Sequence, residues 1–502
     1  MITLDLTSLA TAANGQLVGD EALAALTVDN LVTDSRAVNA QESSAEKESN
    51  VFLALKGPSF DGHRFVKQVI EKGCQVIIVD HLITDIDTSQ VAQIIVDDTR
   101  IALGKIAAFV KAQVAPKTIG ITGSSGKTTV KEMLAVILSR LGKVLATEGN
   151  FNNDIGVPLT LLRLSQDDDF AVIEMGANHI GEIAYTTELV KPDIAMINNI
   201  AAAHLEGFGD LCGVARAKGE IFSALAAEGV ALYNKDTKYT SKWQWRLTNK
   251  QVRTFSCANA NSAGSAVNAD VTSHNVCLDG NGCASFDLQT PIGECAITLT
   301  VPGKHNVCNA VAAAAAAIEC GASLTDIRLG LAEMAPVKGR LNMHQLDKSL
   351  TLIDDTYNAN VESIKAAIAL LANYSGQRIL VLGDMAELGS DARSYHQEVG
   401  EYAKEQGIDV LFTLGVLSQN TSDAFARKNT ATSEHFSDRA ELCAQLFALV
   451  AAQKQTNNSQ ILVKGSRSAH MEYVVEDIIS WHVNQNKENQ SQVINPNKQD
   501  NS

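Results

Sequence analysis

The segment Thr118-Ile-Gly-Ile-Thr-Gly-Ser-Ser-Gly-Lys-Thr-Thr129 joins an apolar run to a glycine- and serine-rich turn and then to a helical pattern. Residues 118–122 have the composition of a buried strand, and apolar residues recur at helical spacing over residues 130–141. Backbone N–H groups in such a turn point at phosphate oxygens, and the helix N-terminus adds positive charge. The segment therefore predicts a phosphate-binding loop of the short form G-x-x-G-K-T, since Ile121 stands where the longer Walker A motif has glycine.

Seven residues of this segment are expected to contact a nucleotide. Lys127 would reach the β- and γ-phosphates, and the hydroxyl of Thr128 would bind Mg²⁺. The alternative is an ordinary glycine turn between a strand and a helix, with a surface lysine. The expected contacts are Gly123, Ser124, Ser125, Gly126, Lys127, Thr128 and Thr129.

Short apolar runs alternate with helical patterns on both sides of this loop, which indicates mostly parallel sheets covered by helices. At 502 residues the chain is too long for one hydrophobic core. We therefore expect an α/β protein of three domains, 1–115, 116–335 and 336–482, with the P-loop ATPase in the centre. The Asn-, Gln- and Lys-rich segment 483–502 is expected to be a disordered tail.

Within the first domain, strands are expected at 51–55 and 76–79, with a helix at 65–72 between them. The charged insertion 41–50 is expected to loop out. In the central domain, the polar stretch 259–268 is predicted to be a loop or the start of a less regular β portion.

The composition of the chain argues against several classes of function. The net charge of −16 argues against binding to nucleic acid or to an anionic membrane. The nine cysteines show no C-x-x-C pair and no zinc-like spacing, so we expect reduced thiols rather than a disulfide framework or structural zinc. The N-terminus lacks the features of a signal peptide, and no stretch approaches roughly 18 uninterrupted apolar residues. We expect a cytoplasmic monomer without membrane insertion.

Polar side chains follow several of the expected strands. Glu174 ends an apolar strand, where a carboxylate is costly unless a cation such as Mg²⁺ accompanies it, although a strand end facing water is the alternative. Taken alone, His204 is more often structural than a ligand, and Lys218 resembles a helix-surface lysine. Asn306 and Asn309 lie three apart at a helix start, where Asn309 could read an adenine edge and Asn306 could cap the helix.

Three polar turns follow strands in the third domain, at residues 355–360, 383–389 and 464–468. In open α/β sheets, ligands bind outside the carboxyl ends of the strands. These turns are therefore expected to face a ligand.

In this order, the phrases T-G-S-S-G-K-T-T, E-M-G, N-N-I-x-x-x-H, A-K-G-E, G-K-H-N-x-x-N-A, G-R, D-x-Y-N-A-N and K-G-S-R resemble the Mur ligases over residues 30–480. The resemblance implies ATP-dependent formation of an amide bond through an acyl phosphate, in the synthesis of peptidoglycan precursors. Within the family, the phrases at 57–63, 174–178, 355–360 and 382–388 are similar to the member that adds D-alanyl-D-alanine. The implied partners are UDP-N-acetylmuramoyl-tripeptide and D-alanyl-D-alanine, with ATP and Mg²⁺ as cofactors.

The resemblance also implies roles for residues and domains. The N-terminal domain would bind the UDP-sugar, and the C-terminal domain would be Rossmann-like. Lys218 matches a lysine that is carbamoylated in the family, which would make it a metal ligand.

The implied catalytic residues are Lys127, Lys218, His204 and Arg340, and the implied metal ligands are Thr128, Glu174, His204 and Lys218. Beyond the loop, the implied nucleotide contacts are Asn309, Arg340 and Asp355. The implied substrate contacts are Ser35, Arg36, Phe60, Asp61, Gly62, His63, Asn150, Asn153, Tyr357, Asn358, Asn360 and Lys464.

Three other functions are compatible with parts of this pattern. A ligase of the same architecture could add a diamino acid, or it could be an enzyme that adds glutamate to folate. The phrase at 355–360 argues against the diamino-acid ligase, and the UDP-type N-terminal segment argues against the folate enzyme. A P-loop switch or motor ATPase would need no anion at Lys218 and would hydrolyse ATP without an amine acceptor. A catalytically inactive nucleotide-binding scaffold would not need the full set of polar residues that this chain retains.

Overall fold

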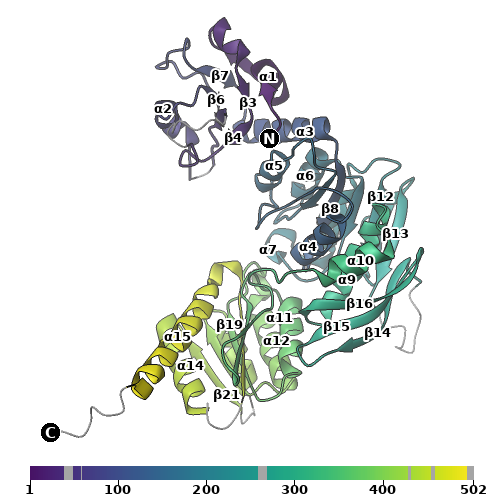
Figure 1. The fold of residues 1–502 in the computed structure, drawn as a ribbon, viewed down its shortest axis with the longest axis vertical. Helices are drawn as coiled ribbons and strands as arrows, with labels where there is room; N and C mark the ends of the chain where they lie inside the picture. Colours follow the sequence, from purple (N-terminus) through teal and green to yellow (C-terminus); the bar gives the residue numbers. More distant parts are fainter. Residues whose placement is uncertain (39–48, 58, 258–267, 428–430, 454–457, 495–502) are drawn as a thin grey trace, which may run out of the picture.

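The structure is a computed structural model that describes residues 1–38, 49–57, 59–257, 268–427, 431–453 and 458–494 of the 502-residue chain. It is elongated, and three α/β domains follow one another along its long axis (Figure 1). This arrangement confirms the expected fold class, with a mostly parallel sheet in each domain.

The N-terminal domain is built on a five-stranded sheet of order β2-β7-β6-β5-β4, in which only β2 is antiparallel to its neighbour. The strands and helix expected at 51–55, 76–79 and 65–72 are confirmed as β5, β6 and α2. Residues 41–48 of the expected insertion lie outside the described residues. Asn50, its last residue, belongs to β5. The elements are β1 (Leu4–Asp5), α1 (Leu6–Ala13), β2 (Gln16–Val18), β3 (Thr27–Val28), β4 (Asn30–Val32), β5 (Asn50–Leu53), α2 (Val66–Glu71), β6 (Val76–Val79), β7 (Ala92–Ile95) and α3 (Thr99–Val114).

The central domain has a nine-stranded sheet of order β16-β15-β14-β13-β12-β11-β8-β10-β9. Strands β8 to β14 run parallel, whereas β14, β15 and β16 form antiparallel hairpins that the sequence patterns did not reveal. The stretch expected as a loop, 259–268, lies outside the described residues except for residue 268. The strands are β8 (Lys117–Thr122), β9 (Val144–Ala146), β10 (Phe170–Glu174), β11 (Ile194–Ile197), β12 (Val230–Asn234), β13 (Gln251–Ser256), β14 (Val271–Leu278), β15 (Cys283–Thr290) and β16 (Gly293–Pro302).

Helices cover both faces of the parallel part of this sheet. Helices α4, α9 and α10 pack together on one face and bury an alanine-rich surface of α9. Helices α5 and α6 lie on the other face (Figure 1). The helices are α4 (Lys127–Leu138), α5 (Gly156–Leu161), α6 (Glu182–Val190), α7 (Leu205–Phe208), α8 (Leu211–Lys218), α9 (His305–Glu319) and α10 (Leu324–Ala332).

The C-terminal domain has a six-stranded sheet of order β17-β18-β22-β19-β20-β21, parallel except for β17. One core cluster lies under α11, α12 and α13, and a second lies under α14 and α15. The elements are β17 (Asn342–Gln345), β18 (Leu350–Asp355), α11 (Val361–Ala372), β19 (Gln377–Gly383), α12 (Ala392–Glu405), β20 (Val410–Leu414), α13 (Gln419–Ala426), β21 (Thr432–Phe436), α14 (Arg439–Gln453), β22 (Ser459–Lys464) and α15 (Glu472–Ile494).

The last helix corrects one expectation. The segment 483–502 was expected to be disordered, but α15 continues through it to Ile494, and residues 495–502 lie outside the described residues. Val474 and Ile478 anchor the start of this helix in the core, and the Asn, Gln, Lys and Glu residues that follow extend it. Among the helices that the structure describes, none combines the length and apolar character needed to cross a membrane.

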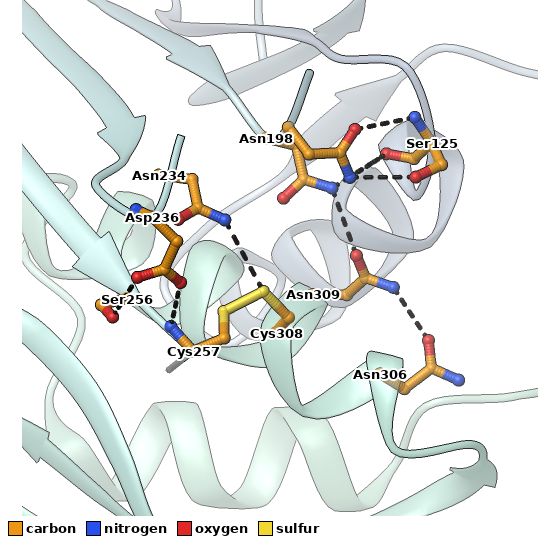
Figure 2. Close-up of a disulfide and its surroundings, with 10 residues drawn as sticks. Ser125, Asn198, Asn234, Asp236, Ser256, Cys257, Asn306, Cys308 and Asn309 are labelled. Carbon is orange, nitrogen blue, oxygen red and sulfur yellow. Dashed lines mark hydrogen bonds between the residues drawn. A yellow bond between two sulfur atoms is a disulfide. The ribbon is translucent and has the colours of Figure 1, made fainter. Parts of the chain in front are cut away.

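A disulfide corrects a second expectation, namely that the cysteines remain reduced. Cys257, just after β13, is bonded to Cys308 in the first turn of α9, with a Cα–Cα distance of 5.3 Å (Figure 2). The two residues are separated by 51 positions in the sequence. No short spacing motif marks such a pair, so only the fold reveals it.

Helix α3 links the N-terminal and central domains. The carboxylate of Asp98 caps its first turn by accepting hydrogen bonds from the backbone N–H groups of Arg100 (2.7 Å) and Ile101 (3.0 Å). The helix packs against α1 on one side and against α5 and α6 on the other. As a result, one hydrophobic cluster runs from the first domain through α3 into the second.

The shared core makes a prediction about stability. Leu103 of α3 is fully buried in this cluster, so Leu103→Ala should destabilise the protein by about 2–5 kcal/mol. Ile101 on the same helix is 43% exposed, and Ile101→Ala is the matched control with a much smaller expected effect. Scanning calorimetry of Leu103→Ala should show the unfolding transitions of the N-terminal and central domains shifting together to lower temperature. Equal shifts in the two variants would contradict the shared core.

Candidate active site

A cavity of about 760 Å³ lies between the phosphate loop, the start of α9 and the strand ends of the C-terminal domain. This size and this place, outside the carboxyl ends of parallel strands, are typical of ligand sites. Many of the predicted residues line it: Ser124, Ser125, Gly126, Lys127, Thr129, His204, Asn309, Arg340, Asp355, Asn358, Asn360 and Lys464.

The phosphate loop is fixed by two consecutive asparagines after β11. The side-chain oxygen of Asn199 accepts hydrogen bonds from the N–H groups of Ser124 (3.0 Å) and Ser125 (2.9 Å). Asn198 donates to the carbonyl of Ser125 at 3.0 Å (Figure 2). Gly126 ends the loop with φ of 75°, a conformation that favours glycine. A side chain there would also overlap the amides of Asn198 and Asn309.

Lys127 folds back over this loop. Its Nζ donates to the carbonyl of Gly123 at 2.8 Å. Burial lowers the pKa of Lys127, and the nearby carboxylate of Glu174 opposes that shift in part. A phosphate group in the cavity would therefore meet a cation whose present partner is a neutral carbonyl.

Thr128 joins three parts of the site through its hydroxyl. Its Oγ1 donates to Oε2 of Glu174 at 2.9 Å and accepts from Nη2 of Arg340 at 3.0 Å. The other carboxylate oxygen of Glu174 accepts from Asn152 at 2.8 Å. Glu174 is thus a buried carboxylate at the end of β10, as expected, rather than one facing water.

Lys218, at the end of α8, is almost completely buried rather than on the helix surface. Among the described residues its Nζ has no hydrogen-bond partner, and it lies 5.5 Å from the ring centre of Phe208. Burial, reinforced by the charge of Lys127, lowers the pKa of Lys218 to about 7. An amine with this pKa is available in its neutral, nucleophilic form at neutral pH.

His204 connects the central and C-terminal domains. Its Nδ1 forms an ion pair with Glu387 from the turn after β19, and the backbone of Glu387 accepts a hydrogen bond from Glu206. The φ of His204 is 54°, which is uncommon for a residue with a side chain. In this conformation, the imidazole of His204 pairs with the C-terminal domain rather than with Glu174.

The start of α9 faces the loop through a chain of three amides. Asn198 donates to Oδ1 of Asn309 at 3.2 Å, and Asn309 donates to Oδ1 of Asn306 at 2.9 Å (Figure 2). Asn306 donates in turn to the carbonyl of Pro302, four residues earlier. Both ends of the Asn309 amide therefore have protein partners, and Asn306 ties the helix start to β16.

Two predicted residues of the C-terminal domain, Lys464 and Asn360, have hydrogen-bond partners within the protein. Lys464 forms a buried ion pair with Asp355 at 2.6 Å and also donates to the carbonyl of Asn358 at 2.9 Å. Asn360 caps α11, with its side chain accepting from the N–H of Ser363 at 2.8 Å. Both residues line the cavity, but these contacts also give each of them a structural role.

Tyr357 reaches toward the central domain rather than into the cavity. Its hydroxyl donates to the carbonyl of Gly149 at 3.3 Å, and the guanidinium of Arg340 lies 4.3 Å from its ring centre. Burial raises the pKa of Tyr357. Asn150 and Asn153 lie in the same loop as Gly149, outside the cavity lining, and the side chain of Asn153 accepts from the N–H of Gly156, the first residue of α5, at 2.7 Å.

The predicted residues of the N-terminal domain are not part of this cavity. Asp34 and Arg36 form an exposed ion pair at 2.6 Å, which lowers the pKa of Asp34 to about 2. The carbonyl of Ser35 accepts from Lys72 at 2.7 Å, and Phe60 is 49% exposed. Asp61 fixes His63 through the ring Nδ1 at 2.7 Å, and Gly62 packs against the backbone of Leu55.

Comparison with known proteins gives the family. Three family models match: "Mur ligase family, catalytic domain" over residues 30–111, "Mur ligase middle domain" over 121–317 and "Mur ligase, glutamate ligase domain" over 339–467. The chain is 46% identical over 475 residues to UDP-N-acetylmuramoyl-tripeptide–D-alanyl-D-alanine ligase of Escherichia coli K12, which covers 95% of this chain and 98% of that one. The chain belongs to the Mur ligase family.

Solved Mur ligase structures share the fold. A crystal structure of MurF from Acinetobacter baumannii superposes with a TM-score of 0.86 at 37% identity, covering 96% of this chain and 99% of that chain. MurF from Thermotoga maritima in complex with ADP superposes with a TM-score of 0.78 at 24% identity, covering 91% of this chain and 99% of that chain.

Several residues of this Mur ligase site were missed by the sequence analysis. Asn199 holds the phosphate loop and Asn152 holds Glu174, and both stand in polar phrases after strands, which is the signal that could have found them. Glu387 pairs with His204 from another domain, and no local pattern indicates that contact.

The loop geometry makes a second prediction. Gly126→Ala should weaken ADP binding about tenfold or more, because the new methyl group forces Asn309 and Asn198 apart at a cost of about 1–3 kcal/mol. Gly321 also has a positive φ, of 90°, but open space around it, so Gly321→Ala is the matched control for backbone strain alone. Calorimetric titration with ADP measures both. Unchanged affinity in Gly126→Ala would argue against nucleotide contact at this loop.

Proposed function

We propose that this Mur ligase joins D-alanyl-D-alanine to the tripeptide carboxylate of UDP-N-acetylmuramoyl-tripeptide, with conversion of ATP to ADP and phosphate. The observation that supports this best is the 46% identity, over nearly the full length of both chains, to the Escherichia coli enzyme of that name. The phosphate loop at the cavity supports the use of ATP.

The reaction has two steps in this proposal. A carboxylate oxygen of the tripeptide attacks the γ-phosphorus of ATP, and ADP leaves, which gives an acyl phosphate. The amine of D-alanyl-D-alanine then attacks the acyl carbon, phosphate leaves and the nitrogen loses a proton. The first step converts a poor leaving group into a good one, and the protein mainly positions the reactants and neutralises charge.

The residues of the cavity suit this work. The N–H groups of the loop and the ammonium of Lys127 would hold the β- and γ-phosphates. The guanidinium of Arg340, already directed at Thr128, would neutralise charge that develops on the transferred phosphoryl group. Asn309 would contact the base through the N–H and the lone pair that its present amide partners leave free.

Mg²⁺ fits the oxygen donors present. Thr128 and Glu174 offer a hydroxyl and a carboxylate in direct contact, and oxygen is the ligand that Mg²⁺ prefers. When bound, the ion supplies positive charge to the phosphates. As an ammonium, Lys218 cannot be a ligand, but carbamoylation would give it an anionic oxygen pair. His204 would have to leave Glu387 to join them.

Other parts of the proposal follow from the sequence. Residues 1–115 would form the domain that binds the UDP-sugar, through Ser35, Arg36 and the segment 60–63. Residues 116–335 would form the domain that binds ATP, and residues 336–482 the domain that closes over the site. Asn150, Asn153, Tyr357, Asn358, Asn360 and Lys464 would serve the acceptor and the dipeptide or position the residues that do. We also propose that the enzyme is a cytoplasmic monomer without a nucleic-acid partner.

The direct test measures phosphate release from ATP and Mg²⁺ with UDP-N-acetylmuramoyl-tripeptide, with and without D-alanyl-D-alanine. We expect release to require both substrates, and mass spectrometry to show a product heavier by the dipeptide. Release that ignores the dipeptide would exclude this specificity and favour a different amine, to be sought among single amino acids.

Carbamoylation of Lys218 can be tested separately. Only the neutral amine adds CO₂, so with a pKa of about 7 the carbamate should increase as the pH rises through 7 and decrease below it. After incubation with ¹³C-bicarbonate, a carbamate resonance should be present in the wild-type enzyme and absent in Lys218→Arg, which keeps a cation but cannot be carbamoylated. The variant should lose roughly a hundredfold or more in kcat, as for other lost electrostatic groups. A fully active Lys218→Arg enzyme would exclude the role.

A further inference from the structure

The Cys257–Cys308 disulfide lies beside the nucleotide cavity. Cys308 lines that cavity, and together with Cys257 it also lines a second cavity of about 380 Å³. Cys308 therefore borders both cavities and Cys257 borders one, which gives a small thiol a route to the bond. Of the other cysteines, Cys74 and Cys443 are buried, and Cys277 is exposed on β14.

The disulfide joins two elements with different roles. On the side of β13, Asp236 fixes the chain, since its carboxylate accepts from the N–H of Cys257 at 2.8 Å and from the hydroxyl of Ser256 at 2.6 Å (Figure 2). On the other side, Cys308 directly precedes Asn309 in the first turn of α9. The bond thus ties the turn that carries Asn309 to a strand end that is itself held in place.

We propose that Cys257 and Cys308 form a redox modification site whose oxidation by low-molecular-weight disulfides weakens nucleotide binding and whose reduction by thiols restores it. This proposal rests on the proposed function in one respect, the cytoplasmic location. An ATP-dependent enzyme in the compartment where we place it meets a reducing thiol pool, in which disulfides are transient and serve redox sensing.

The coupling follows from the amide contacts of Asn309. Asn198 and Asn306 each take one hydrogen-bonding position of the Asn309 amide, so one N–H and one lone pair remain to read a base edge. These two bonds set the direction of the remaining positions, so fitting them to a base requires a small shift of the first turn of α9. A covalent bond at the adjacent residue opposes that shift, so the oxidised form binds nucleotide more weakly.

The exchange chemistry balances with glutathione disulfide as the oxidant. One cysteine thiolate attacks a sulfur of glutathione disulfide, forms a mixed disulfide and releases one glutathione thiolate. The second cysteine thiolate attacks the protein sulfur of the mixed disulfide and releases the second glutathione. The protein loses two electrons and two protons, and glutathione disulfide becomes two glutathione molecules.

The experiment uses the full-length protein equilibrated at several ratios of reduced to oxidised glutathione. Peptide mass spectrometry after alkylation measures the Cys257–Cys308 cross-link, and calorimetric titration measures ADP affinity in each sample. We expect a reversible cross-link and an ADP Kd that rises about fivefold or more on oxidation, the lower end of coupling between linked sites. Because ADP binding needs neither acceptor nor dipeptide, failure of the ligase assay would leave this result interpretable.

Matched variants assign the effect to this pair. Cys257→Ser should abolish the redox dependence of ADP affinity, and Cys277→Ser, at an exposed cysteine of β14, should leave it intact. Cys257→Ala serves if the serine variant does not fold. Absence of the cross-linked peptide at every glutathione ratio would overturn the site, and a cross-link without a change in ADP Kd would overturn its effect on the nucleotide.

Discussion

The hydroxyl of Thr128 is the point on which the active site depends. It donates to Glu174 at the end of β10 and accepts from Arg340, which stands just before β17 at the start of the C-terminal domain. A hydroxyl can do both at once because it offers one donor and two acceptor lone pairs. The phosphate loop, the central sheet and the connection to the third domain therefore share one small polar group. Serine is the one other common side chain that offers an aliphatic hydroxyl at that distance from the backbone.

Around this hydroxyl the site concentrates positive charge in a protein whose net charge is −16. Lys127, Lys218 and Arg340 gather near the carboxylate of Glu174, and burial lowers the pKa of both lysines. Charges held close together in a site with little water repel strongly unless anions join them. The cavity is therefore arranged for a ligand that brings several negative charges, as a nucleotide triphosphate does.

Features set by neighbouring residues were predictable from the sequence, and features set by distant contacts were not. The strand, loop and helix around the phosphate site follow from local periodicity and glycine placement, and the structure confirms them. The expected substrate contacts of Asn360 and Lys464 stay predictions, and the fold adds partners that no local pattern indicated, a helix N-terminus for the first and a carboxylate on an adjacent strand for the second. The pairing of Glu387 with His204 and the bond from Cys257 to Cys308 join segments that only the folded chain brings together. A single sequence contains no periodic signal for such contacts.

Because of helix α3, the three domains are not equally separable from one another. The hydrophobic cluster that contains α3 takes residues from both the first and the second domain, whereas the two clusters of the third domain take residues from that domain alone. A chain cut ahead of β17 would separate a unit with its own complete interior. A cut after α3 would instead expose apolar surface on both fragments. In terms of evolutionary exchange, the C-terminal domain can be transferred with its interior intact, whereas exchange of the N-terminal domain alone has to preserve the packing of α3 against the central domain.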